Sequence, residues 1–110
     1  DYEGALGYYQ QALRVKEKTL GKTHPSTLQT IMNMASTYKN GLNDFVKAEE
    51  MYRHTLDGYE KSLGKENARA KGCALNLAVL LEDLGTRKED LRKVLDDYPH
   101  LERIRLIWHY

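Results

Sequence analysis

Histidine is the commonest general base and metal ligand in proteins, and this chain of 110 residues carries four. No two of them have the spacing that would place both on one face of a helix. They are His24, His54, His100 and His109. We therefore predict that the histidines lie in loops or on the surface and hold no metal.

Other reactive side chains are equally isolated. Glu49–Glu50 and Asp96–Asp97 are adjacent carboxylates that point in different directions on a helix, so neither pair forms a facing acid and base. Cys73 is the only cysteine and is most simply a small, partly buried apolar residue. The phosphate-binding patterns GxxxxGKS, GxxxxGKT and GxGxxG are absent. These observations predict a protein that is not an enzyme and uses no cofactor.

Composition argues against nucleic-acid and membrane partners. The 17 basic and 16 acidic residues leave a formal charge of +1, too little to draw the chain to a polyanion. The longest uncharged stretch, residues 23–38, contains too many polar side chains to cross a bilayer. A single cysteine suits a reducing compartment, and we expect a cytoplasmic protein.

The chain repeats itself, and the repeat indicates which elements must position any functional side chain. EKTLGK at residues 17–22 recurs as EKSLGK at residues 60–65. When residues 1–43 are aligned with residues 44–86, eleven of the 43 pairs are identical. The apolar matches follow helical spacing. Tyr2, Ala5, Tyr9 and Leu13 return as Phe45, Ala48, Tyr52 and Leu56. The sequence therefore predicts a tandem repeat of helices.

Helices are predicted over residues 2–20, 25–40, 44–63, 67–84 and 87–97. Glycines 21, 41, 64 and 85 stand where the first four helices should end, since glycine adopts the left-handed closing conformation at little cost. In the recurring hexapeptide, Leu20 and Leu63 are predicted to be the last buried residues of their helices. Pro99 interrupts a helical rhythm that continues to Trp108, so a second short helix should begin there.

Paired helices with small residues at their crossings (Ala35, Ala48 and Ala78) resemble the tetratricopeptide repeat. The long repeat and the segments HPSTL, N-x-A-x-x-Y, A-x-x-x-Y and E-K-x-L-G are similar to the kinesin light chain family over about residues 1 to 86. The resemblance implies an all-α superhelix, or solenoid, of tandem helix-turn-helix repeats with about five to six helices.

The resemblance also implies one domain, residues 1–110. Residues 1–22 would be the second helix of a repeat, 23–64 a full repeat, 65–98 a degenerate last repeat and 99–110 a capping segment. Because the first helix of the first repeat is missing, Tyr2, Tyr9 and Leu13 should lack a packing partner. We expect either a longer repeat array that continues upstream or another chain that covers these residues.

In the resembling family, the first helices of the repeats line a concave groove that binds extended peptides. The resemblance therefore implies a non-catalytic adaptor module that binds a peptide or a partner protein. The residues expected to face the peptide come from residues 25–40 and 67–84. They are Gln29, Met32, Asn33, Ser36, Lys39, Asn40, Leu75, Asn76, Val79 and Glu82, and Gly72 and Asp83 share their side of the helix.

Asn33 and Asn76 occupy the same repeat position, and two roles are open for them. A side-chain amide can donate and accept, so it can pair with the main chain of any peptide, which is its role in the family. Alternatively, each amide caps or bridges neighbouring helices. A clamp for a ligand carboxylate is not expected, because Lys39 and Lys71 are the only cations near this surface.

Apolar ligand side chains fit the surface better, since Met32, Leu75 and Val79 lie on it. A second hypothesis is structural. The unpaired first helix and the apolar C-terminal tail, residues 101–110, could join copies of the chain into an oligomer.

Overall fold

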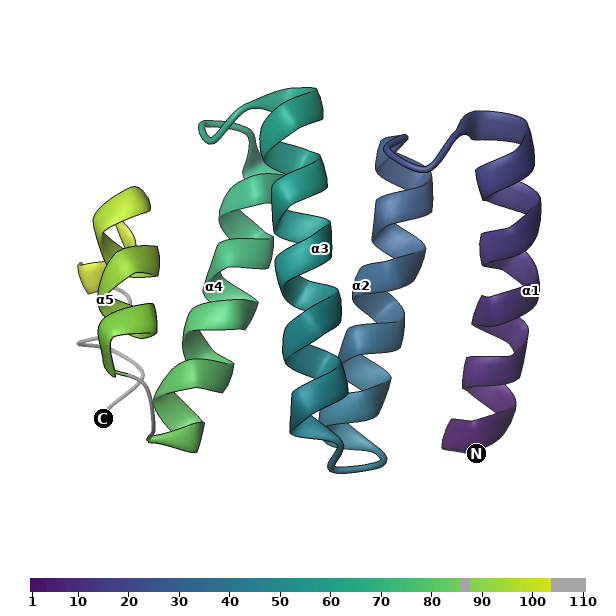
Figure 1. Ribbon diagram of the computed structural model, residues 1–110, viewed down its shortest axis with the longest axis horizontal. Helices are drawn as coiled ribbons and strands as arrows, with labels where there is room; N and C mark the ends of the chain where they lie inside the picture. The colour runs from purple at the N-terminus through teal and green to yellow at the C-terminus, as the bar shows by residue number, and fades with distance from the viewer. Residues whose placement is uncertain (86–87, 104–110) are drawn as a thin grey trace.

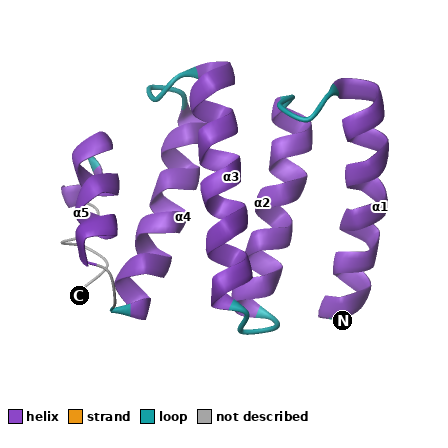
Figure 2. Ribbon diagram, viewed as in Figure 1, coloured by secondary structure: helices purple, strands orange, loops and turns teal. Residues whose placement is uncertain are grey.

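The computed structural model describes residues 1–85 and 88–103 and consists of helices throughout those ranges. The helices are α1 (Tyr2–Leu20), α2 (Pro25–Asn40), α3 (Phe45–Leu63), α4 (Ala68–Leu84) and α5 (Lys88–Asp97). They stand side by side in chain order, and the turns between α1 and α4 alternate between the two ends of the row (Figures 1 and 2). The all-α repeat is confirmed, with every predicted helix present and its bounds within one residue.

The two first helices of the repeats, α2 and α4, begin with the same cap although their sequences differ. His24 accepts a hydrogen bond at Nδ1 from the backbone N–H of Ser26, at 3.1 Å. Asn67, at the matching repeat position, accepts one at Oδ1 from the N–H of Arg69, at 2.8 Å. Each side chain satisfies a donor that the helix itself leaves unpaired. The replacement of histidine by asparagine therefore preserves the start of the helix.

Three of the four closing glycines behave as predicted: φ is 94° at Gly21, 86° at Gly64 and 66° at Gly85. The prediction for Gly41 is wrong, because its φ of −96° and ψ of −42° are right-handed. The left-handed residue in that turn is Asn43, with φ of 54°. Gly41 instead makes room for an aromatic ring, since a Cβ built there would lie 2.3 Å from the ring of Tyr2.

The prediction that Leu20 and Leu63 are buried is also wrong. They are 45% and 37% exposed. In α3 the last buried residue is Tyr59, one turn earlier. The last turns of α1 and α3 are left uncovered because the chain turns back at the glycine that follows each of them. The next helix begins four residues after that glycine, at Pro25 and at Ala68 respectively.

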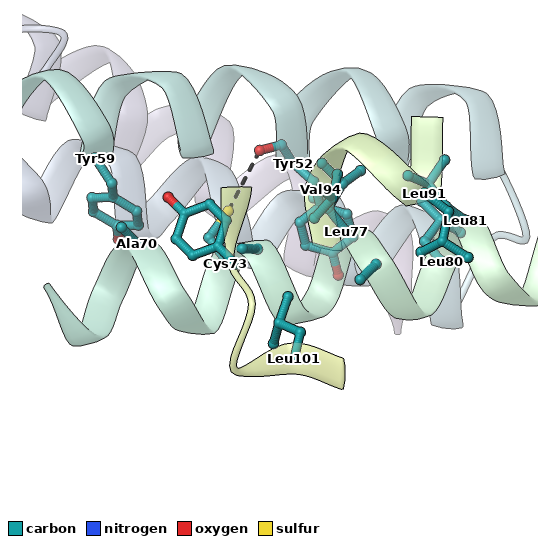
Figure 3. Packing of buried hydrophobic residues seen from close by; sticks show 14 of the residues in the cluster. Tyr52, Tyr59, Ala70, Cys73, Leu77, Leu80, Leu81, Leu91, Val94 and Leu101 are labelled. Carbon is teal, nitrogen blue, oxygen red and sulfur yellow. Dashed lines mark hydrogen bonds between the residues drawn. The ribbon is translucent and has the colours of Figure 1, made fainter. Parts of the chain in front are cut away.

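The core runs between the helices of neighbouring pairs. Ala35, Ala48 and Ala78 are completely buried, as expected for small residues where helices cross closely. Helix α4 contributes seven buried residues to this core, and Figure 3 shows two of them, Leu77 and Cys73, beside Tyr52 and residues of α5. Each fully buried leucine of this cluster contributes about 1.5–3 kcal/mol relative to an exposed one.

Helix α1 packs mainly on α2, and its apolar stripe is incompletely covered. Leu6 is its one buried residue, whereas Leu13 packs half-buried against the core. Tyr2, predicted to lack a partner, lies against Gly41. Tyr2 nevertheless remains 52% exposed, and Tyr8 and Val15 are more exposed still, at 70% and 61%.

The chain breaks its helical course at Pro99, as predicted. Helix α5 ends at Asp97, Pro99 lies in a turn, and helical structure resumes from residue 101 to residue 103. The Tyr98 hydroxyl donates a 2.6 Å hydrogen bond to Glu60 of α3, and Leu101 is completely buried. The rest of the predicted capping segment, residues 104–110, lies outside the described residues.

Candidate binding face

The ten residues predicted to contact a peptide lie on α2 and α4, and together we call them the α2–α4 face. Nine are half-buried and Asn40 is exposed, as are the neighbouring Gly72 and Asp83. Half-burial means that these side chains are packed at their bases and accessible at their tips. They are therefore fixed in place yet able to contact a ligand.

Side chains of α2 and α4 meet directly, which makes the face continuous across the repeat boundary. The Asn76 Nδ2 group donates to the sulfur of Met32 over 3.8 Å. At the other end of the helices, Lys39 Nζ lies 3.9 Å from Asp83 Oδ2. A ligand crossing from α2 to α4 would thus meet one surface.

Two tyrosines of α3 support the face from below, a feature that the sequence analysis missed. The Tyr52 hydroxyl lies 2.8 Å from Ser36 Oγ, and the Tyr59 hydroxyl donates to Gln29 Oε1 over 3.4 Å. Both rings are almost completely buried, and burial raises the pKa of each phenol. The phenols therefore stay protonated at neutral pH. The signal available in the sequence was Tyr59 itself, which carries a polar tip on an otherwise apolar stripe.

The two asparagines each make one contact within the repeat. Gln29 Nε2 donates to Asn33 Oδ1 at 3.2 Å, while Asn76 donates to Met32. Among the described residues, neither Asn33 Nδ2 nor Asn76 Oδ1 has a hydrogen-bond partner. Each half-buried amide thus bridges to a neighbour with one group and has no partner for the other among the described residues. The bridging role is observed, and the peptide-binding role stays a prediction.

The cations near the face are already paired with acids. Lys39 lies beside Asp83, and Lys71 Nζ lies 3.4 Å from Glu66 Oε2. Such exposed pairs contribute little to stability, but they offset the positive charge that a carboxylate clamp would need. The face is therefore better suited to uncharged main chain and apolar side chains, which Met32, Leu75 and Val79 can contact.

A hollow of about 300 Å³ lies beside the face rather than within it, between α4 and α5. It is lined by Leu81, Leu91 and Leu95 together with polar residues, and Glu82 is the member of the α2–α4 face that reaches it. A second hollow lies between α3 and α5, lined by residues that include Arg53, Glu60 and Asp97.

Cys73 has no environment for chemistry. Its thiol is completely buried and donates to the carbonyl oxygen of Tyr52 over 3.4 Å (Figure 3). Burial, and secondarily the charge of Glu60, raises the pKa of the thiol to about 12. A thiol held protonated is a poor nucleophile and a poor metal ligand.

Within residues 1–85 and 88–103, no three His, Cys, Asp or Glu side chains are grouped so that they could hold a metal. The imidazole of His24 serves as the helix cap described above, and His109 lies outside the described residues. No helix in the same ranges combines the length and apolar character needed to span a membrane.

Stacked helix pairs with alternating turns and matched caps define a helical-repeat protein, a class in which neighbouring hairpins bury a common core. A model of the tetratricopeptide repeat matches residues 1–61, which is more than half of the chain. The chain belongs to the tetratricopeptide repeat family, which is generally a non-catalytic fold for protein interaction.

Known relatives agree with the predicted resemblance to kinesin light chains. The chain is 29% identical over 101 residues to "Protein KINESIN LIGHT CHAIN-RELATED 2" of Arabidopsis thaliana. The aligned region covers 88% of this chain and 15% of the relative. The crystal structure of BtubC (BKLC) from P. vanneervenii has a TM-score of 0.75 at 21% identity, covering 87% of this chain and 37% of that one. The second match confirms the fold. The chain spans only a small part of either protein's length.

Proposed function

We propose that the chain is an adaptor module that binds an extended peptide, or an extended segment of a partner protein, along the α2–α4 face. The observation that carries this proposal is the pair of matched amides, Asn33 and Asn76, each half-buried with one polar group unpaired among the described residues. An unpaired amide group on a firmly packed helix can bind peptide main chain without regard to its side chains.

The apolar part of the face adds selectivity. Met32, Leu75 and Val79 are half-buried, so a ligand side chain placed over them would remove further apolar surface from water. The proposed ligand therefore combines exposed main-chain groups with apolar side chains. In this proposal residues 23–64 and 65–98 act as the two repeats that supply the face. The likeness to a kinesin light chain-related protein supports the adaptor role.

The test is a peptide selected from a random phage-displayed library, with affinity measured by fluorescence polarisation. Asn33→Ala together with Asn76→Ala should weaken binding about tenfold or more, since each lost hydrogen bond contributes about 0.5–1.5 kcal/mol. The melting temperature should hardly change. Gln10→Ala, which removes an exposed amide from α1, is the matched control and should bind normally.

Two results would contradict the proposal. Unchanged affinity in the double variant would show that the amides do not contact the ligand. A large fall in melting temperature would assign them to holding the helices together.

A second candidate function, assembly, rests on the uncovered side of α1. Tyr8 and Val15 border a shallow hollow of about 320 Å³ that also includes Ala12. If copies associate there, sedimentation equilibrium should show an oligomer that Tyr8→Lys with Val15→Lys dissociates. A strict monomer at high concentration would remove this candidate.

A further inference from the structure

A chain of polar contacts runs from the buried side of α3 to the α2–α4 face. It begins at the hydroxyl of Tyr59, whose side chain is completely buried. Tyr59 donates to Gln29 over 3.4 Å, and Gln29 donates to Asn33 over 3.2 Å.

The direction of this chain follows from its first member. The phenol of Tyr59 has a single proton, and this proton is directed to Gln29 Oε1. The oxygen of the Gln29 amide is then occupied, and its nitrogen faces Asn33. Asn33 must therefore accept with Oδ1, which leaves its NH₂ group directed away from the chain. In the reversed arrangement Gln29 would donate to Tyr59, and the phenol proton would need another acceptor. Because Tyr59 is completely buried, solvent water cannot serve as that acceptor.

The matching residue on α4 presents the opposite group. Asn76 uses its NH₂ group on the sulfur of Met32, a weak acceptor. Its Oδ1 atom has no partner among the described residues. The face thus offers a donor from α2 and an acceptor from α4, although both come from the same residue type at the same repeat position.

We infer that Tyr59 and Gln29 are positioning residues that hold Asn33 as a hydrogen-bond donor, so that the face accepts a peptide carbonyl over α2 and a peptide N–H over α4. This inference rests on the proposed function and deepens it. A helical ligand has its interior N–H and C=O groups already paired, whereas an extended segment has both free. The class of ligand is therefore an extended main chain laid across the two helices.

Gln29→Glu is the sharpest test because it changes one NH₂ group into an oxygen. A carboxylate at position 29 still accepts from Tyr59, but it can no longer donate to Asn33. The Asn33 amide should then turn and donate to Glu at that position, which presents Oδ1 to the ligand. An acceptor would face the ligand's carbonyl, and affinity for the selected peptide should fall about tenfold.

Gln10→Glu is the matched control. It makes the same change from amide to carboxylate at an exposed residue of α1, outside both the α2–α4 face and the chain of contacts. Its affinity should stay within about twofold of the unchanged protein at 0.15 M salt, where exposed charges are screened. Tyr59→Phe removes only the hydroxyl. It should lower affinity less than Gln29→Glu, because the Gln29 amide then becomes free to adopt either orientation.

A readout that needs no ligand is the side-chain amide signal of Asn33 in ¹⁵N–¹H NMR spectra. In Gln29→Glu this signal should move downfield, as expected for an N–H that has gained a charged acceptor, whereas Gln10→Glu should leave it in place. With the peptide bound, N-methylation of one ligand residue should abolish the contact to Asn76 and weaken binding.

The possible failures are separable. If the Asn33/Asn76 double variant binds normally, or no peptide can be selected, the proposed function fails. If that variant is impaired but Gln29→Glu binds normally and leaves the Asn33 signal unmoved, the positioning role is overturned while the proposed function stands. If N-methylation at every ligand position is harmless, the main-chain contact is wrong.

Discussion

Helices α1 and α3 are copies of one another in sequence but not in surroundings. Tyr9 and Tyr52 occupy the same repeat position, yet Tyr52 is 2% exposed and contacts Ser36, whereas Tyr9 is only half-buried. The difference arises because α3 packs against both α2 and α4, while α1 packs mainly against α2. The same apolar stripe is thus a core in one copy and a partly open surface in the other, so in a repeat protein burial is set by the neighbours.

The two copies also differ in sequence at a position that matters for packing. Gly58 of α3 allows Leu28 of α2 to approach so closely that an added Cβ would lie 2.7 Å from a leucine methyl group. At the matching position α1 has Val15. A helix packed on α1 in the manner of α2 would therefore need a smaller residue where α2 has leucine.

The largest expected effect comes from deleting the buried tyrosine. Tyr52→Ala should lower the free energy of unfolding by about 3–5 kcal/mol, as is usual for a buried aromatic side chain. Tyr9→Ala, its matched counterpart, should cost less than about half of that, because less area is returned to water. Urea denaturation measures both, and equal losses would mean that α1 is as well covered as α3.

Next in size are the closing glycines, where the two copies should behave alike. Gly21 and Gly64 share φ near 90° and a ψ of 160°, a region that essentially only glycine occupies. Alanine at either position should cost about 1–3 kcal/mol in thermal unfolding. Similar costs would place the difference between the copies in their packing, whereas a cost confined to Gly64→Ala would show that the turn after α1 is loose.

Exchanging the residues that distinguish the copies should have a smaller and asymmetric effect. Gly58→Val should destabilise the chain by about 1–2 kcal/mol, because overpacking against Leu28 outweighs the gain in helix propensity. The reciprocal Val15→Gly should cost about 0.5 kcal/mol or less, since it changes only helix propensity at an exposed site. Calorimetry of the two variants decides the point. A harmless Gly58→Val would mean that α2 can shift away from α3.

The smallest effect at neutral pH concerns Cys73, which occupies the same repeat position as Thr30. Cys73 contacts α3 through Tyr52, and Thr30 contacts α1 through Lys16. The pKa of Cys73 is about 12 in the folded chain against an ordinary value of 9.0. The folded state therefore binds this proton more tightly, and the resulting stability is complete below about pH 9 and lost as pH rises towards 12.

Melting temperatures measured from pH 7 to 11 should fall less steeply in Cys73→Ala than in the unchanged chain. The native thiol should also resist iodoacetamide at pH 8. Rapid labelling without unfolding would show that α3 does not cover it.

The helices could be predicted from the sequence because their signals are local. Apolar spacing, Pro25 and the closing glycines act within a few residues. The repeat then placed the ten residues of the α2–α4 face on these two helices. The failures involve neighbours that are distant in sequence. The conformation of Gly41 is linked to the ring of Tyr2, and the exposure of Leu63 depends on where the next helix begins.

The polar support of the face was unpredictable for the same reason. Whether the hydroxyl of Tyr59 reaches Gln29 depends on the distance between α3 and α2. A repeat alignment gives register but no such distance.

The hydrogen bond from Tyr98 to Glu60 joins the segment after α5 to α3, although α4 lies between these two helices in the chain. The ion pair Arg53–Asp90 also joins α3 to α5, and the ion pair Lys65–Asp97 joins the turn after α3 to the end of α5. Stacked hairpins ordinarily hold only their immediate neighbours and can fray from either end. Here the C-terminal three helices should open together as one cooperative unit, while α1 detaches first. Amide hydrogen exchange would show this as one shared opening rate for α3, α4 and α5, and a faster one for α1.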